Sequence, residues 1–157
     1  MATIEQKWFD YVLTLAADNV THGGGPFAAL ILRDGELIAE GVNSVTRTND
    51  PTAHAEVIAI RKVCEKLGSF QLDDCILIAS CEPCPMCFGA IYWARLSAVM
   101  YLASGDDAAG AGFDDAFIRS ELKLPLSHTR IPFRRIVHPD AGKPFEYWKA
   151  SGSKTEY

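Results

Sequence analysis

Apolar residues near the start of the chain recur at the spacing of a helix. One stripe follows a 3.6-residue period and comprises Ile4, Trp8, Tyr11, Val12 and Leu15. Three glycines at 23–25 and Pro26 end this pattern, because glycine and proline both interrupt helices. The chain is therefore expected to open with an amphipathic helix that packs one face on a core.

A pair of strands follows the first helix. Residues 27–32 form a short continuous apolar run, which is typical of a strand buried on both faces. Asp34-Gly35 is a hairpin turn sequence, so residues 36–45 are expected to return beside the first strand, with Asn43 near their end.

Helices and strands then alternate. The pattern predicts a helix from about residue 50 to 67, a strand at 75–80, a turn at 83–85 that opens a helix to residue 95, and a strand at 97–103. Beyond these it predicts a loop at 104–112, a short helix at 114–122, a strand at 131–137 and a helix at 144–150. Such alternation after a hairpin indicates an α/β fold with layers around a mostly buried sheet.

Composition narrows the class of protein. The 157 residues suit one domain, with 48% hydrophobic and 22% charged residues. No apolar run reaches membrane-spanning length, and the N-terminus lacks the pattern of a signal peptide. Five cysteines, three of them within seven positions, favour metal binding in a reducing compartment over disulfides, so a cytoplasmic location is expected. The net charge of −5 and the scattered basic residues argue against a nucleic-acid partner and suit a small neutral substrate.

Two short segments supply a ligand set for zinc. Cys84 and Cys87 are three residues apart at a predicted helix entry, a spacing that places both sulfurs on one side. His54, at the start of another predicted helix, is the expected third ligand, and three protein ligands are typical of a catalytic zinc site. Glu56 follows His54 by two residues, which places it off the ligand face and in position to move a proton of the water that zinc activates.

Other interpretations of these cysteines remain open. Cys81 and Cys84, like Cys84 and Cys87, have the spacing of a redox pair. Cys81 could also serve as a fourth ligand, which would close the site into a structural zinc centre. The helix entries that follow a strand at both segments favour a catalytic zinc.

The chain resembles the zinc-dependent cytidine/deoxycytidylate deaminase superfamily, whose signature is H-x-E followed by P-C-x-x-C. Within it, the sequence is most similar to the small bacterial guanine deaminases. The resemblance covers the whole chain and rests on these segments: Gly25-Pro26-Phe27, Asn43, Asp50 to Glu56, Cys81 to Cys87, Ala90 to Arg95, Gly112 to Asp115, and Glu156-Tyr157. It implies a three-layer α/β/α fold around a central five-stranded mixed sheet.

The resemblance also implies an activity and a substrate site. The reaction is hydrolysis of guanine to xanthine and ammonia, with one zinc per subunit held by His54, Cys84 and Cys87 and with Glu56 as the proton carrier. The residues that it places at the base are Asn43, Phe27, Trp93, Asp115, Asp114 and Tyr157. Asn43 could instead satisfy backbone groups at a strand end, and Asp114 could cap a helix. Phe27 and Trp93 could simply belong to the core.

For Tyr157 the resemblance implies a homodimer. The C-terminal segment, about residues 140–157, would be swapped so that Tyr157 reaches the active site of the partner subunit. A frayed chain end is the plain alternative.

Three rival functions remain. A tRNA adenosine deaminase shares the D-P-T-A-H-A-E segment, and a cytosine or nucleoside deaminase shares the zinc signature. A non-catalytic binding module stabilised by zinc is the rival from another class of protein.

Overall fold

The computed structural model describes residues 4–157. The chain forms two compact units, the first ending at Asp115 and the second comprising Ala116–Tyr157.

A four-stranded mixed sheet is the centre of the first unit. Its strands are β1 (Ala28–Arg33), β2 (Glu36–Val42), β3 (Cys75–Cys81) and β4 (Ala98–Ala103), in the order β2-β1-β3-β4. β1 runs antiparallel to β2 and to β3, whereas β3 and β4 are parallel. Asp34 and Gly35 join β1 to β2 with φ values of 53° and 83°, the left-handed backbone that a tight hairpin requires.

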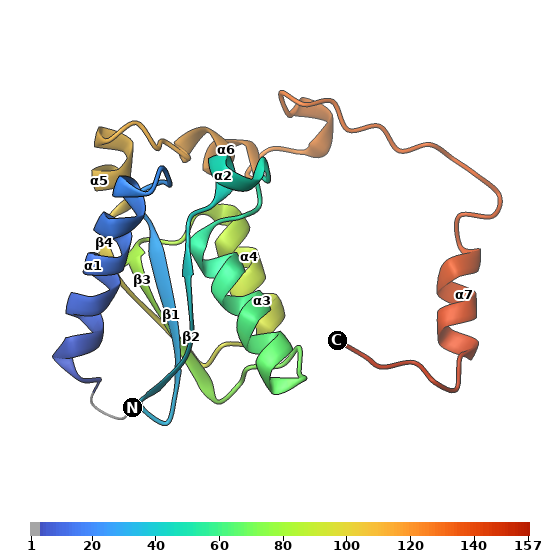
Figure 1. The fold of residues 1–157 in the computed structure, drawn as a ribbon. Coiled ribbons are helices and arrows are strands. Elements are labelled where there is room, and N and C mark those ends of the chain that lie inside the picture. The colour runs from blue at the N-terminus through green and yellow to red at the C-terminus, as the bar shows by residue number, and fades with distance from the viewer. Residues whose placement is uncertain (1–3) are drawn as a thin grey trace. The chain divides into compact units, whose positions relative to one another are not determined.

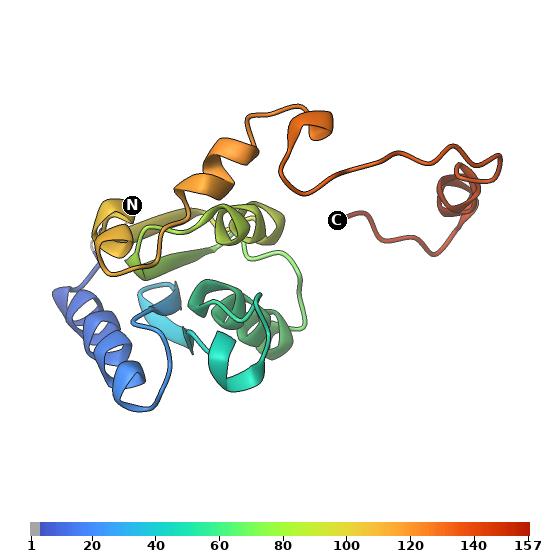
Figure 2. The same cartoon turned by 90° about the horizontal axis from the view of Figure 1, so that it is seen from above.

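Helices cover both faces of this sheet, as the α/β interpretation predicts. α1 (Gln6–Thr21) lies on one face, and α3 (Ala55–Leu67) and α4 (Pro85–Ala94) lie on the other (Figures 1 and 2). The three-layer α/β/α architecture is therefore confirmed. Two short helices, α2 (Val45–Thr48) and α5 (Gly105–Gly110), follow β2 and β4.

The side chains of β1 explain why the sheet is buried between the layers. Ala28, Leu30 and Leu32 pack with α1, while Ala29 and Ile31 point to the opposite face and pack with α3 and α4. All five are 0–1% exposed. Because successive side chains of a strand point to opposite faces, β1 contributes to two apolar clusters. This is why every position from 28 to 32 is apolar.

The edge strand β2 is held closely by α3. A Cβ at Gly41 would lie 2.1 Å from the carbonyl oxygen of Ala55, so only glycine lets the start of α3 approach the strand this closely. Lys62 Nζ donates to the Glu40 carbonyl at 2.9 Å, and Lys66 Nζ donates to the Ile38 carbonyl at 3.0 Å. Two lysines one helical turn apart therefore occupy carbonyls two residues apart on the outer edge of β2.

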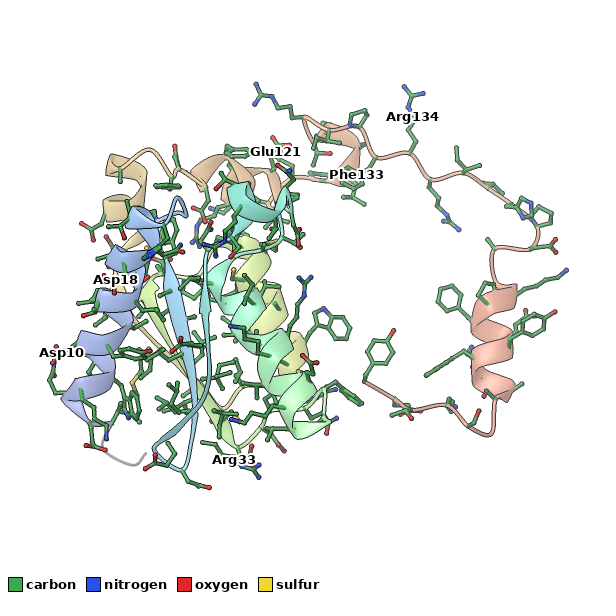
Figure 3. All side chains as sticks on the ribbon, in the orientation of Figure 1. Asp10, Asp18, Arg33, Glu121, Phe133 and Arg134 are labelled. Carbon is green, nitrogen blue, oxygen red and sulfur yellow. The ribbon has the colours of Figure 1, made fainter. Side chains whose placement is uncertain are left out.

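The second unit contains α6 (Ala116–Glu121), a 3-10 turn η1 (Leu126–His128) and α7 (Lys143–Ala150). Phe133 and Arg134 lie on the extended stretch between η1 and α7 (Figure 3). This stretch is not a strand, so the expected strand at 131–137 and a five-stranded sheet are wrong for the described residues. Its backbone makes no strand pairing among the described residues, and Ile136 and Val137 are 78% and 88% exposed.

Two local predictions also need correction. α3 begins at Ala55 rather than near residue 50, because Asp50 Oδ1 accepts from the backbone N–H of Thr52 at 2.8 Å and makes a turn. Residues 104–112 contain helix α5 where a loop was expected. There Ser104 and Asp107 form a reciprocal capping box. Within residues 4–157, no helix is both long enough and apolar enough to cross a membrane.

Candidate active site

Two helix N-termini bring the predicted zinc ligands together. His54 is the N-cap of α3 and Cys84 is the N-cap of α4, both with extended backbone. Neither side chain caps its own helix, so both remain available to a shared ligand. Cys87 lies in the first turn of α4 and is fully buried. Because α3 and α4 pack on the same face of the sheet, all three side chains converge.

The three side chains have the separations that a tetrahedral zinc requires. His54 Nδ1 lies 3.5 Å from Cys84 Sγ and 3.6 Å from Cys87 Sγ. Bonds of about 2.3 Å to sulfur and about 2.0–2.1 Å to nitrogen place tetrahedral ligands about 3.6 Å apart. Within residues 4–157, these three form the only group of His, Cys, Asp or Glu side chains close enough to hold a metal ion.

The protonation of the cluster favours a thiolate at Cys84. With no metal between them, a hydrogen bond from Cys87 and a second from His54 lower the pKa of the Cys84 thiol to about 4, against the effect of burial. The same hydrogen bond, together with burial, raises the pKa of the Cys87 thiol. The bond with Cys84 also raises the pKa of the His54 imidazole. Metal binding therefore has to displace protons from His54 and Cys87.

Glu56 lies beside this cluster without belonging to it. It is in the first turn of α3 and only 8% exposed. Burial raises the pKa of its carboxyl group, while a hydrogen bond from Cys87 acts in the opposite direction. A buried carboxyl group with a raised pKa binds a proton more readily than an exposed one and can release it again, which suits a proton carrier.

Cys81 does not extend the ligand set. Its side chain is buried at the end of β3, and Sγ donates to the carbonyl of Ser104 at 3.4 Å. It is not a member of the metal-binding group formed by the described residues. The structure thus gives no support to the interpretation of a four-ligand structural centre.

Comparison with known proteins places this site in a family. Residues 2–103 match the model of the cytidine and deoxycytidylate deaminase zinc-binding region. The chain belongs to this deaminase family. Zinc is therefore its cofactor, and His54, Cys84 and Cys87 are the described residues whose geometry fits that metal.

Two guanine deaminases are among the similar proteins. The guanine deaminase of Bacillus subtilis is 57% identical over 146 residues, which are 92% of this chain and 94% of that protein. The X-ray structure of guanine deaminase from Bacillus subtilis has a TM-score of 0.96 and covers 99% of both chains. A guanine deaminase structure from Nitrosomonas europaea is 38% identical, with a TM-score of 0.66 over 68% of this chain and 63% of that one.

A tRNA-specific adenosine deaminase from Aquifex aeolicus is also similar, but over a shorter stretch. It is 41% identical over 81 residues, which are 52% of this chain and 54% of that protein. The similarity to the Bacillus protein extends well beyond this length.

Asn43 of the deaminase is buried at the end of β2 with its amide orientation fixed. Its Oδ1 accepts from the backbone N–H of Val45 at 3.3 Å and so satisfies a backbone group at the strand end, which is the alternative role of this residue. That bond uses the carbonyl side of the group. The amide nitrogen Nδ2 makes no hydrogen bond within the described residues and is not closed off from solvent, so it is available as a donor.

The aromatic residues predicted to contact the base lie in different places. Phe27 precedes β1 and packs edge-on against Phe113, with ring centroids 4.9 Å apart. This contact anchors the segment that continues into Asp114 and Asp115 near the start of β1. Trp93 lies nine residues beyond Cys84 on α4, about 13 Å along the helix axis, and is 65% exposed. The structure does not bring Trp93 into the metal cluster.

Tyr157 belongs to the second unit. Its ring lies 6.5 Å from that of Trp148 on α7, and its side chain is 70% exposed. Its contact with a substrate therefore stays a prediction, as do those of Asp114 and Asp115.

Two further residues contribute to this region, Phe113 from the Gly112 to Asp115 segment of the resemblance and Asn19, which the sequence did not single out. Phe113 supports Phe27, and Asn19 of α1 donates to the backbone carbonyls of Gly25 and Asn43. In the sequence, Asn19 is marked only by being a lone asparagine on an otherwise apolar helix face.

Proposed function

We propose that this deaminase converts guanine and water into xanthine and ammonia. The observation that carries the proposal is the extent of the similarity. The family region ends at residue 103, whereas the likeness to the Bacillus guanine deaminase structure covers 99% of the chain. It therefore includes the residues after β4, where the resemblance places Asp114, Asp115 and Tyr157.

The roles of the residues follow from their chemistry. His54, Cys84 and Cys87 hold zinc, which when bound makes a water molecule acidic enough to react near neutral pH. Glu56 accepts one proton of the attacking water on a carboxylate oxygen and passes it to a ring nitrogen. It then takes the proton of the new C2 hydroxyl group and passes it to the departing amino group. Water adds at C2 of guanine, the C2–N bond breaks, and ammonia leaves.

Recognition of the base is assigned to groups outside the metal cluster. Asn43 donates from Nδ2 to an acceptor on guanine, and Asp115 or Asp114 accepts from its ring N–H groups. Phe27 and Trp93 remain candidates for contact with the purine ring. Burial of Asn43, with its Oδ1 already occupied, supports a fixed donor rather than a mobile one.

A panel of amines tests the substrate. The purified protein is expected to release ammonia from guanine and to form xanthine, with much slower release from adenine, cytosine, their nucleosides and ammeline-like triazines. Deamination of tRNA without xanthine formation from guanine would replace the proposal by tRNA editing, and preference for cytosine or a nucleoside would reassign the base. No release from any of these compounds would favour a non-catalytic zinc module.

We further propose that the two units serve one deaminase domain in a cytoplasmic homodimer, with residues 140–157 swapped onto the partner subunit. Charge supports the pairing. Residues 1–115 contain seven Lys and Arg against sixteen Asp and Glu, a net −9, while residues 116–157 contain eight against four, a net +4. Exposed aromatic side chains in the second unit, Phe145 at 69% and Tyr147 at 72%, supply an apolar surface. Five unpaired cysteines support the cytoplasmic location.

Removing Tyr157 is expected to reduce kcat/KM for guanine about tenfold or more without lowering the melting temperature, because its side chain is 70% exposed and buries little apolar area. Steady-state kinetics and a thermal melt measure the two effects. Tyr157→Phe is the matched variant that keeps the ring and removes only the hydroxyl.

Mixed dimers distinguish a swapped tail from one that serves its own subunit. A chain without Tyr157 keeps an intact zinc site, and a Glu56→Gln chain keeps an intact tail. Refolding the two together should restore part of the activity, because the intact tail reaches the intact site of the partner. A mixture that stays as inactive as its components would remove the swap.

A further inference from the structure

A buried asparagine on α1 ties together two segments that border the substrate site. Asn19 is 5% exposed, although the helix face that carries it is otherwise apolar. Its Nδ2 donates to the carbonyl of Gly25 at 2.8 Å and to the carbonyl of Asn43 at 2.8 Å. Both protons of one amide nitrogen are thus used, one by the loop before β1 and one by the end of β2.

The glycines of the loop are shaped around this amide. A Cβ at Gly24 would lie 2.2 Å from Asn19 Nδ2, and a Cβ at Gly25 would lie 3.2 Å from the carboxamide of Asn43. No larger residue at position 24 allows the loop to close on Asn19. The loop, the amide of Asn19 and the side chain of Asn43 therefore form one packed unit.

Backbone bonds carry this constraint to the residues assigned to the base. Phe27 N–H donates to the Gly25 carbonyl at 2.8 Å, and Asn43 N–H donates to the Phe27 carbonyl at 3.0 Å. The Asn43 side chain is then turned by the bond from Val45 N–H to its Oδ1. Loss of the Asn19 amide would free both ends of this chain of contacts at once.

We propose that Asn19 is a positioning residue for substrate recognition, which holds the Gly25 turn and the Asn43 backbone in register so that the Asn43 amide meets the base. The effect of this role on KM rests on the proposed function, whereas its effect on the order of the two segments does not. Because both partners are carbonyl oxygens, replacing the donor by an acceptor of the same shape removes both bonds and sets like partial charges against each other.

Asn19→Asp tests the inference with a near-isosteric change. We expect KM for guanine to rise about tenfold, kcat to change less than about threefold and zinc content to stay at one per chain, because the metal ligands lie on α3 and α4. Hydrogen exchange at the amides of Phe27, Asn43 and Val45 is expected to accelerate. Should Asn19→Asp not fold, Asn19→Ser is the milder variant, since it removes both Nδ2 bonds without setting a carboxylate against the two carbonyls.

Val12→Ala is the matched control on the same helix, where a fully buried apolar side chain belongs to the cluster with β1 and makes no hydrogen bond to the Gly25 or Asn43 carbonyl. It should lower the melting temperature without raising KM. An unchanged KM in Asn19→Asp, or an equal rise in Val12→Ala, would overturn the positioning role. If the parent protein does not deaminate guanine, the proposed function fails separately, and the exchange rates alone decide whether Asn19 holds the two segments.

Discussion

Replacing Glu56 by glutamine lowers kcat for guanine by about 10²–10⁴-fold and leaves zinc bound and the chain folded. The reason lies in the position of the carboxyl group. It is buried in the first turn of α3 and contacts the Cys87 thiol, yet it does not belong to the metal-binding group. Glutamine keeps the shape of the side chain but cannot take up a proton. Ammonia release measures kcat, and atomic absorption measures zinc per chain.

Glu65→Gln provides the control, because Glu65 is exposed on the same helix and away from its N-terminus. Its kinetics should match those of the parent protein. Loss of zinc together with activity in Glu56→Gln would make Glu56 a metal ligand instead. Undiminished turnover would show that the chemistry does not pass through this carboxyl group.

Stripping zinc with a chelator abolishes turnover and lowers the melting temperature by about 10 °C. The ligands come from segments thirty residues apart in sequence, so they converge only in the folded chain and zinc stabilises that state selectively. At a free zinc concentration about a thousand times Kd, this linkage contributes about 4 kcal/mol. Differential scanning calorimetry with and without added zinc measures the shift.

Cys87→Ala should reproduce the stripped state even with zinc present, because it removes a buried ligand of the cluster. Cys64→Ala is the comparison, since this thiol lies half-buried on α3 and outside the group. It should retain one zinc per chain and the full thermal response. A Cys87→Ala protein that still binds zinc at the parent stoichiometry would contradict the assigned ligand set.

The elements that the sequence predicts well are those whose hydrophobic pattern and whose starting and ending residues lie close together in the chain. The helix stripe of α1, the Asp34-Gly35 turn and the ending of α3 at Gly68 with φ of 62° all follow from nearby residues. The start of α3 does not. Asp50 and Pro51 suit a helix start, but Asp50 bonds Thr52 in a turn, and the two uses of an aspartate look alike in sequence. The helix therefore starts later, and His54 becomes its N-cap.

The zinc site could be predicted because a single ion dictates how its ligands are spaced. No comparable constraint fixes the spacing of the residues around the substrate. Segment 131–137 has the composition of a strand, yet strand formation depends on a partner edge that the pattern of these residues cannot specify. Asn19 acts on backbone carbonyls, which every residue possesses, so no partner side chain in the sequence indicated its bonds. Helix α5 was hidden by small residues, although its Ser104-to-Asp107 capping box could have been recognised.

The two lysines on the outer edge of β2 limit how copies of this protein can add strands to one another. A sheet whose two edge strands can both pair with a strand of another copy can extend without end, as in a fibril. Here Lys62 and Lys66 already occupy the carbonyls of Glu40 and Ile38, which leaves β4 as the edge of this sheet where another strand can pair. A strand from another copy that adds to β2 therefore has to break these two bonds first, which disfavours growth of a filament through this edge.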